Sequence, residues 1–267
     1  MKFQYAMALF AGFVLAAASS NAADLASDNA SDVVYNDGWG AGDNGGTGFG
    51  AWTQSGSTNG SNGGYFVGSS TGNGDGDGDA DGDIDTGGEA LNIYANGGQT
   101  VTATRGFTGG ALSVGQTFQI AFDNGFIDGG GSVSFVLETS AGTDRFGFNF
   151  TGGNANFAIV DNSGSVDTGI GFTDEGLLLN VTLTSADAYS VDIITLSGTP
   201  ATNTFTGTLA ASGSLDQFTV INATAGPGGD HNAGWNSFAV IPEPSTMALT
   251  SLGMLGLGFL RRRRLAK

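Results

Sequence analysis

The 267-residue chain contains no cysteine and only one histidine, His231. Without cysteine it has no disulfide, no thiol nucleophile and none of the usual structural zinc sites. A Ser-His-Asp triad would require His231 as its base, yet no Gly-x-Ser-x-Gly motif is present. These absences exclude the thiol enzymes and argue against a serine hydrolase, so we expect His231 to be an ordinary loop residue.

Basic residues are also scarce. Between Ala23 and Ile241 the chain has only Arg105 and Arg145, against 24 acidic residues. The formal charge of this region is therefore −22, more negative than the −17 of the whole chain. Such a surface repels nucleic acid and anionic membranes and attracts divalent cations. We expect no nucleic-acid partner.

The N-terminus has the features of a secretion signal. Lys2 precedes an apolar stretch from Ala6 to Ala18, and Ser20-Asn21-Ala22 supplies the small residues that signal peptidase requires. We therefore predict a signal peptide over residues 1–22, with signal peptidase as a partner. The alternative, a retained membrane helix, is disfavoured by the short apolar stretch and the small residues that follow it.

At the C-terminus, Pro242-Glu243-Pro244 precedes an apolar run from Met247 to Leu260, and four arginines follow that run. A helix over the run would be about 21 Å long, so snorkelling arginines would be needed to complete a crossing of about 30 Å. A cluster of positive charge keeps that side of a membrane helix in the cytoplasm. We predict a short transmembrane helix over 247–260; a buried core helix is the alternative.

This order of Pro-Glu-Pro, apolar helix and arginine cluster resembles the PEP-CTERM sorting signal of exported proteins in Gram-negative bacteria. The residues that carry the resemblance are Pro242, Glu243, Pro244, Arg261, Arg262, Arg263 and Arg264. The resemblance implies a sorting tail over residues 242–267, recognised and processed by an exosortase-type membrane protease. It further implies anchoring in the inner membrane before processing, then a place at the cell surface or in the extracellular matrix, with exopolysaccharide as an associated polymer.

Residues 23–241 are predicted to form one domain, because apolar and polar residues alternate as in half-buried antiparallel strands. The alternating apolar sets include Phe118, Ile120 and Phe122; Val133, Phe135 and Leu137; Phe146, Phe148 and Phe150; and Leu177, Leu179, Val181 and Leu183. Turn sequences rich in Gly, Asn and Asp separate these sets. About twelve short strands and 19 phenylalanines predict an all-β fold, an antiparallel β-sandwich of jelly-roll type.

Residues 36–88 interrupt this pattern with Gly, Asn, Ser, Thr and Asp, so we expect long loops and a few short strands there. We expect Val33-Val34-Tyr35 to pair with the last element, Trp235 to Ile241. The pattern over roughly residues 33–240 resembles concanavalin-like, laminin-G-type sandwiches, for instance at Ala90–Tyr94 and Gly176–Leu179. That fold hosts lectins, glycosidases and structural modules, so it decides no function.

Within these loops, aspartates alternate with mostly small residues from Asp75 to Asp85. Calcium is bound by six to eight oxygens, which closely spaced aspartates can supply. The run resembles the first two-thirds of the calcium loops of EF-hand and thrombospondin type 3 repeats, but position 12 is Gly88 instead of an acid. We predict calcium as a cofactor, with ligands Asp77, Asp79, Asp81, Asp83 and Asp85. The alternative is a solvated acidic spacer.

The inventory of side chains gives little support to an enzyme. The glutamates of the domain, Glu89, Glu138 and Glu175, are far apart in sequence, and the Glu-x-Asp-x-x-Glu signature of sandwich glucanases is absent. We interpret the chain as an exported, non-enzymatic cell-surface or extracellular-matrix protein. The alternatives are a calcium-dependent carbohydrate-binding module and, behind it, a glycoside hydrolase. Aromatic residues could stack on sugars or fill the ends of the sandwich; they are Trp39, Trp52, Tyr65 and Trp235.

Overall fold

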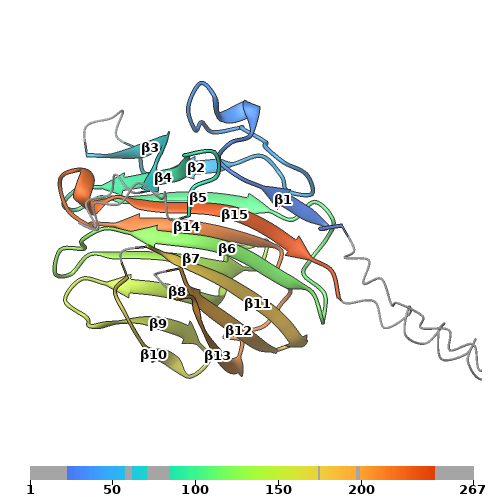
Figure 1. Ribbon diagram of the computed structural model, residues 1–267. Helices are drawn as coiled ribbons and strands as arrows, with labels where there is room; N and C mark the ends of the chain where they lie inside the picture. Colours follow the sequence, from blue (N-terminus) through green and yellow to red (C-terminus); the bar gives the residue numbers. More distant parts are fainter. Residues whose placement is uncertain (1–22, 58–61, 71–83, 174, 197–198, 244–267) are drawn as a thin grey trace, which may run out of the picture.

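The computed structural model describes residues 23–57, 62–70, 84–173, 175–196 and 199–243. These residues form two antiparallel β-sheets packed face to face (Figure 1). Connecting segments include the 3-10 helices η1 (Val33–Tyr35) and η3 (Gly229–His231). The all-β, antiparallel two-sheet sandwich predicted from the alternating pattern is therefore confirmed.

Eight strands make the first sheet, with β15 near its middle. Its order is β13 (Ala201–Thr208), β12 (Ala188–Thr195), β11 (Leu177–Ser185), β6 (Thr117–Asn124), β15 (Ala233–Ile241), β4 (Ala90–Ala95) and β3 (Gly63–Gly68), and β1 (Ala26–Asp28) also pairs with β15.

Seven strands make the second sheet. Its order is β10 (Gly164–Gly171), β9 (Asn156–Asp161), β8 (Asp144–Thr151), β7 (Ser132–Glu138), β14 (Gln217–Ala223), β5 (Thr100–Gly106) and β2 (Thr53–Ser55). The described residues thus contain fifteen strands, a few more than the pattern predicted.

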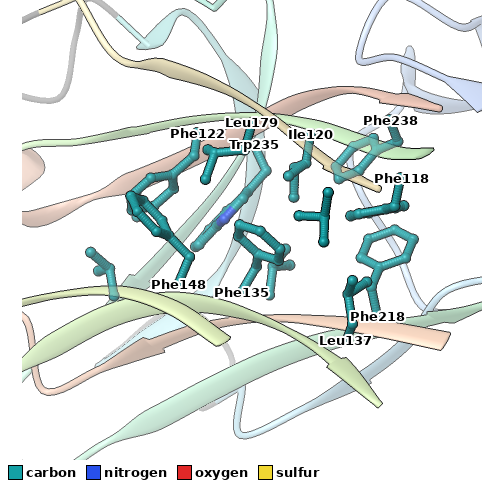
Figure 2. Packing of buried hydrophobic residues seen from close by; sticks show 14 of the residues in the cluster. Phe118, Ile120, Phe122, Phe135, Leu137, Phe148, Leu179, Phe218, Trp235 and Phe238 are labelled. Carbon is teal, nitrogen blue, oxygen red and sulfur yellow. The ribbon is translucent and has the colours of Figure 1, made fainter. Parts of the chain in front are cut away.

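The core lies between the two sheets and is largely aromatic. Figure 2 shows side chains from the eight-stranded sheet, among them Phe122 and Trp235, pointing toward Phe135 and Phe148 of the seven-stranded sheet. All four are at most 1% exposed. Phe122 and Phe148 meet edge to face at 6.1 Å, a preferred geometry for aromatic pairs. The inward orientation predicted for Phe148 is confirmed.

The prediction for the first element is wrong. Val33–Tyr35 forms η1, and the side chain of Val33 is 81% exposed. The strand that pairs with β15 is β1, where Ala26 lies opposite Val240. The hydroxyl of Tyr35 points inward and donates to Asp28 of β1 at 2.5 Å. The chain therefore turns back after β1, and residues 33–35 form a turn of 3-10 helix instead of a strand beside β15. The sequence of β1, Ala-Ser-Asp, carries no apolar alternation that could have identified it.

Candidate functional site

The two ends of the described chain leave the sandwich together. Leu25 donates its backbone N–H to the carbonyl of Val240 at 2.8 Å, and Pro242 and Glu243 follow directly after β15. Figure 1 shows both ends at the same side of the molecule, which we call the tail end. The opposite side, the far end, holds the loops 125–131, 152–155 and 224–232. Pro244 and Arg261 to Arg264 lie outside the described residues.

A buried ion pair attaches the N-terminal segment to the seven-stranded sheet. The side chains of Arg105 and Asp28 form this pair, and both are completely buried. Arg105 also donates to the carbonyl of Gly45 at 2.7 Å and lies 5.1 Å over the ring of Trp52. Burial raises the pKa of Asp28 to about 6, although Arg105 and the hydroxyl of Tyr35 lower it. The pair has a structural role, because it joins β1, the loop that follows it and β5.

Arg145 has a comparable role at the tail end. It is 1% exposed and donates to the carbonyls of Ala210 and Gly213 and to the carboxylate of Asp187. These bonds hold the loop before β14 against β8. Both arginines of the domain are therefore committed to internal contacts.

The predicted calcium residues Asp77, Asp79, Asp81 and Asp83 lie outside the described residues. Asp85 is described, and its Oδ1 accepts a hydrogen bond from the backbone N–H of Ser70 at 2.8 Å. No group of three or more His, Cys, Asp or Glu suited to a metal occurs within the described ranges.

The segment that contains Asp85 is fastened to the outer face of the eight-stranded sheet. Asn236 of β15 is fully buried and donates to the carbonyls of Ile84 and Glu89, both at 2.9 Å. Its own oxygen accepts the N–H of Ala30 at 3.0 Å. The side chain of Ile84 packs on Ala90 and Ala121. One asparagine thus links β15 to two segments that are distant in sequence.

The outer face of the seven-stranded sheet carries polar side chains in register. Glu138 accepts hydrogen bonds from Gln217 at 2.8 Å and Thr219 at 3.0 Å, and Thr219 bonds Thr104 at 2.8 Å. Glu138 is only 8% exposed. Burial raises its pKa, the two hydrogen bonds lower it, and the nearby carboxylate of Asp144 raises it. Sequence spacing could not group these residues, because the partners lie 79 and 81 positions apart.

A hollow of about 360 Å³ opens at the far end of the same face. It lies between the β8–β9 turn and β10, where Asn156 donates to the carboxylate of Asp167 at 2.9 Å. Its lining is Gly153, Asn154, Ala155, Asn156, Ala158, Ser165 and Asp167. The hollow is polar and open to solvent.

The single histidine lies in the far-end loops. His231 ends η3 and is 8% exposed, with Nδ1 at 2.9 Å from Asp230 Oδ1 and Nε2 at 3.4 Å from Asp128 Oδ1. The exposed ring of Phe126 meets the imidazole edge to face at 5.6 Å. The imidazole therefore bridges two loops, in line with the expected loop role.

The tryptophans are part of the core. Trp39, Trp52 and Trp235 are 5%, 2% and 0% exposed. Trp39 contacts both Trp52 and Tyr65 edge to face, at 5.0 and 5.3 Å between ring centroids. Of the two roles considered for these rings, filling the sandwich is the one that their burial supports.

The sequence of the tail matches a known motif. A profile described as the PEP-CTERM protein-sorting motif matches residues 240–264. The tail is a PEP-CTERM sorting motif. The motif implies an exported protein of a Gram-negative bacterium that is processed by exosortase, a membrane protease. None of the helices in the described ranges is long and apolar enough to cross a membrane; the helix predicted over 247–260 lies outside those ranges.

Solved structures of low identity resemble the sandwich. An endo-β-1,4-glucuronan lyase from the fungus Trichoderma reesei has 13% identity and a TM-score of 0.44, over 73% of this chain and 98% of that one. The calcium-bound exoplasmic/lumenal domain of VIP36 has 9% identity and a TM-score of 0.37, over 57% and 77%. A protein of unknown function from Shewanella oneidensis MR-1 has 14% identity and a TM-score of 0.37, over 71% and 87%. No curated protein matches this chain.

Proposed function

We propose that this chain is a non-enzymatic domain displayed at the cell surface or in the extracellular matrix. The observation that carries the proposal is the pairing of β1 with β15, with Ala26 opposite Val240. This pairing brings the segment after the predicted signal peptide and the segment before the sorting tail to one end of the sandwich. A chain anchored through its tail would then point its far-end loops away from the membrane.

The proposal includes the processing steps. Signal peptidase removes residues 1–22, the helix over 247–260 holds the protein in the inner membrane, and exosortase then acts near Pro242-Glu243-Pro244. The support is the matched motif at residues 240–264 together with the apolar stretch after Lys2. Exopolysaccharide is the polymer with which we expect the processed domain to associate.

The side chains of the domain that could take part in catalysis are bound to other groups of the same chain, which supports a non-enzymatic role. Arg105 and Arg145 hold loops, and His231 bridges Asp128 and Asp230 within the far-end loops. A general base must be able to reach a proton of the substrate. His231 has both ring nitrogens directed at carboxylates of its own chain, so it is poorly placed for that task.

Carbohydrate binding is the second candidate, because the outer face of the seven-stranded sheet offers hydrogen-bonding side chains along its length. Glu138, Gln217 and Thr219 lie toward the tail end, and the hollow beside Asn156 and Asp167 lies toward the far end. Hydroxyl, amide and carboxylate groups of this kind suit the hydroxyl groups of a polysaccharide. A glycoside hydrolase that used Glu138 with Asp144 is a third and weaker candidate.

Deletion of residues 242–267 tests the display proposal. The truncated protein should still be exported but should be recovered from the periplasm or medium instead of the surface fraction. Replacement of Arg261 to Arg264 by serine is a milder variant that should impair the same sorting step. Unchanged fractionation of both variants would contradict the proposal.

Glycan binding separates the two candidates. The second candidate predicts that the full-length protein retains a polysaccharide on a glycan array or affinity gel and that Gln217→Ala weakens this binding. Thr206→Ala, on the other sheet, is the matched control. Failure to bind acidic or neutral polysaccharides would leave the structural role as the better interpretation.

A further inference from the structure

Three buried oxygen atoms on the outer face of the eight-stranded sheet have no hydrogen-bond partner among the residues that the structure describes. They are Oγ of Ser70, Oδ2 of Asp85 and Oδ1 of Asn92. Ser70 and Asn92 are 0% and 1% exposed, so bulk water does not replace the missing partners. Buried polar groups are nearly always satisfied in native proteins, so three such oxygens in one place call for an additional ligand.

The three side chains lie together. The backbone N–H of Ser70 donates to the other carboxylate oxygen of Asp85 at 2.8 Å, which places these two residues side by side. A methyl group on Gly234 would lie 3.0 Å from Asn92 Oδ1 and 3.6 Å from Ser70 Cβ. The amide oxygen of Asn92 and the side chain of Ser70 therefore adjoin the same small space above Gly234, where β15 has no side chain.

The orientation of Asn92 is set by its donors. Its Nδ2 gives hydrogen bonds to the carbonyls of Gly68 at 2.9 Å and Ala90 at 3.0 Å. With the NH₂ group held by these two carbonyls, the amide oxygen turns toward Ser70 and Gly234. An acceptor held in this way is preorganised for a cation or for a donor from solution.

The local charge favours a cation. Asp123 is 1% exposed and pairs in register with Gly234 from one side, while Asn92 does so from the other. Arg105 and Arg145, the two basic residues of the domain, lie in other contacts, with Asp28 and Asp187. The carboxylate of Asp85 therefore has no lysine or arginine of the described chain to neutralise it.

We propose that Ser70, Asp85 and Asn92 are ligands of a calcium ion. A carboxylate, an amide oxygen and a hydroxyl form the hard, all-oxygen donor set that calcium prefers. The ion would fasten the two ends of the segment between Ser70 and Asp85 onto the sheet. The inference rests on the unpartnered oxygens of Ser70, Asp85 and Asn92, and no acidic pattern in the sequence identifies Ser70 or Asn92.

The test compares variants of the full-length protein purified in detergent and stripped with EGTA. Calcium should raise the melting temperature more than sodium chloride at matched ionic strength, and calorimetry should give a saturable Kd. Asp85→Asn should weaken calcium affinity by roughly tenfold or more, because ligand charge sets the affinity of calcium sites. Ser70→Ala should also weaken it while leaving the calcium-free melting temperature unchanged or higher, since it removes only an unpartnered hydroxyl.

Asp192→Asn is the matched control. Asp192 lies on the same face of the same sheet and bonds Thr204 at 2.6 Å, so its loss changes the charge but not the proposed site. The control should keep the full calcium response. The inference is overturned if calcium and sodium chloride act alike on the wild type, or if Ser70→Ala and Asp85→Asn both keep the wild-type Kd. Should Asp85→Asn fail to fold, Ser70→Ala decides alone.

Failure of the calcium inference can be distinguished from failure of the sorting proposal. Calcium affinity is measured on purified protein, whereas sorting is measured by cell fractionation, so either can fail without the other. Replacement of Asp77, Asp79 and Asp81 by asparagine reports on the aspartate run. If that variant loses calcium while Ser70→Ala does not, the run binds the ion without Ser70, and the inference is wrong.

Discussion

The carboxylate of Asp28 and the guanidinium of Arg105 form an ion pair in which neither side chain has any solvent exposure. The partners are 77 positions apart, so the pair joins β1 to β5, and Arg105 also holds the loop that contains Gly45. Removal of one partner from such a pair leaves an uncompensated buried charge, which is more costly than loss of the pair itself. The pair therefore makes the attachment of the N-terminal segment dependent on two specific residues.

Arg105→Leu should lower the free energy of unfolding by about 3–5 kcal/mol at pH 7. The loss includes the unpaired Asp28 carboxylate and the acceptors on Asn44, Gly45 and Gly50 that no longer receive a donor. Urea unfolding at equilibrium measures it. The double variant Arg105→Leu with Asp28→Asn should recover part of the loss, and a double variant no better than the single one would show that the buried charge is not the main cost.

The pH dependence of stability should reflect Asp28. Its pKa is raised from 3.8 to about 6 on folding, so the folded protein binds a proton more tightly than the unfolded chain. The associated stabilisation is full below about pH 4 and disappears as pH rises through 6, with an upper limit of about 3 kcal/mol. Denaturant unfolding from pH 4 to 7 measures it, and Asp28→Asn should reduce the slope. Identical slopes in both proteins would contradict the assignment.

Phe148→Ala should destabilise the domain by about 3–5 kcal/mol, because Phe148 has 0% exposure and packs on Phe122, Phe135 and Phe157. Phe126→Ala is the control: that ring is 62% exposed and should cost far less. Thermal or urea unfolding of both variants gives the comparison. Similar losses in the two would mean that burial between the sheets does not determine the cost.

Calcium should stabilise the protein by mass action through the aspartate run as well. An ion bound only by the folded state contributes about 2.7 kcal/mol at one hundred times its dissociation constant. Replacement of Asp77, Asp79 and Asp81 by asparagine should remove most of that response, measured as the shift in melting temperature on adding calcium. Ordinary screening instead predicts that sodium chloride at matched ionic strength stabilises equally well.

Much of the fold could be predicted from the sequence, because alternation of apolar residues directly reports which face of a strand is buried. Phe146, Phe148 and Phe150 lie on one face as expected. The exception was β1, which has only three residues. It is held by its pairing with β15 and by the ion pair between its own Asp28 and Arg105. Its attachment depends on a distant arginine, and no local pattern encodes such a contact.

The candidate sites were less predictable. The tail could be read from residue order alone, since its signal is linear. The grouping of Ser70, Asp85 and Asn92 could not, because it arises from the register of β3, β4 and β15 around Gly234. Glu138 likewise gains its partners only through the neighbouring β14.

The tail continues directly from β15, which is hydrogen-bonded to β6 on one side and to β1 and β4 on the other. In an antiparallel sheet these bonds run perpendicular to the strand. Tension on an anchored tail would therefore act along β15 and shear many bonds on both sides at once, instead of opening them one by one from an edge. The position of this strand suits the domain to bear the mechanical load that the proposed surface display would impose.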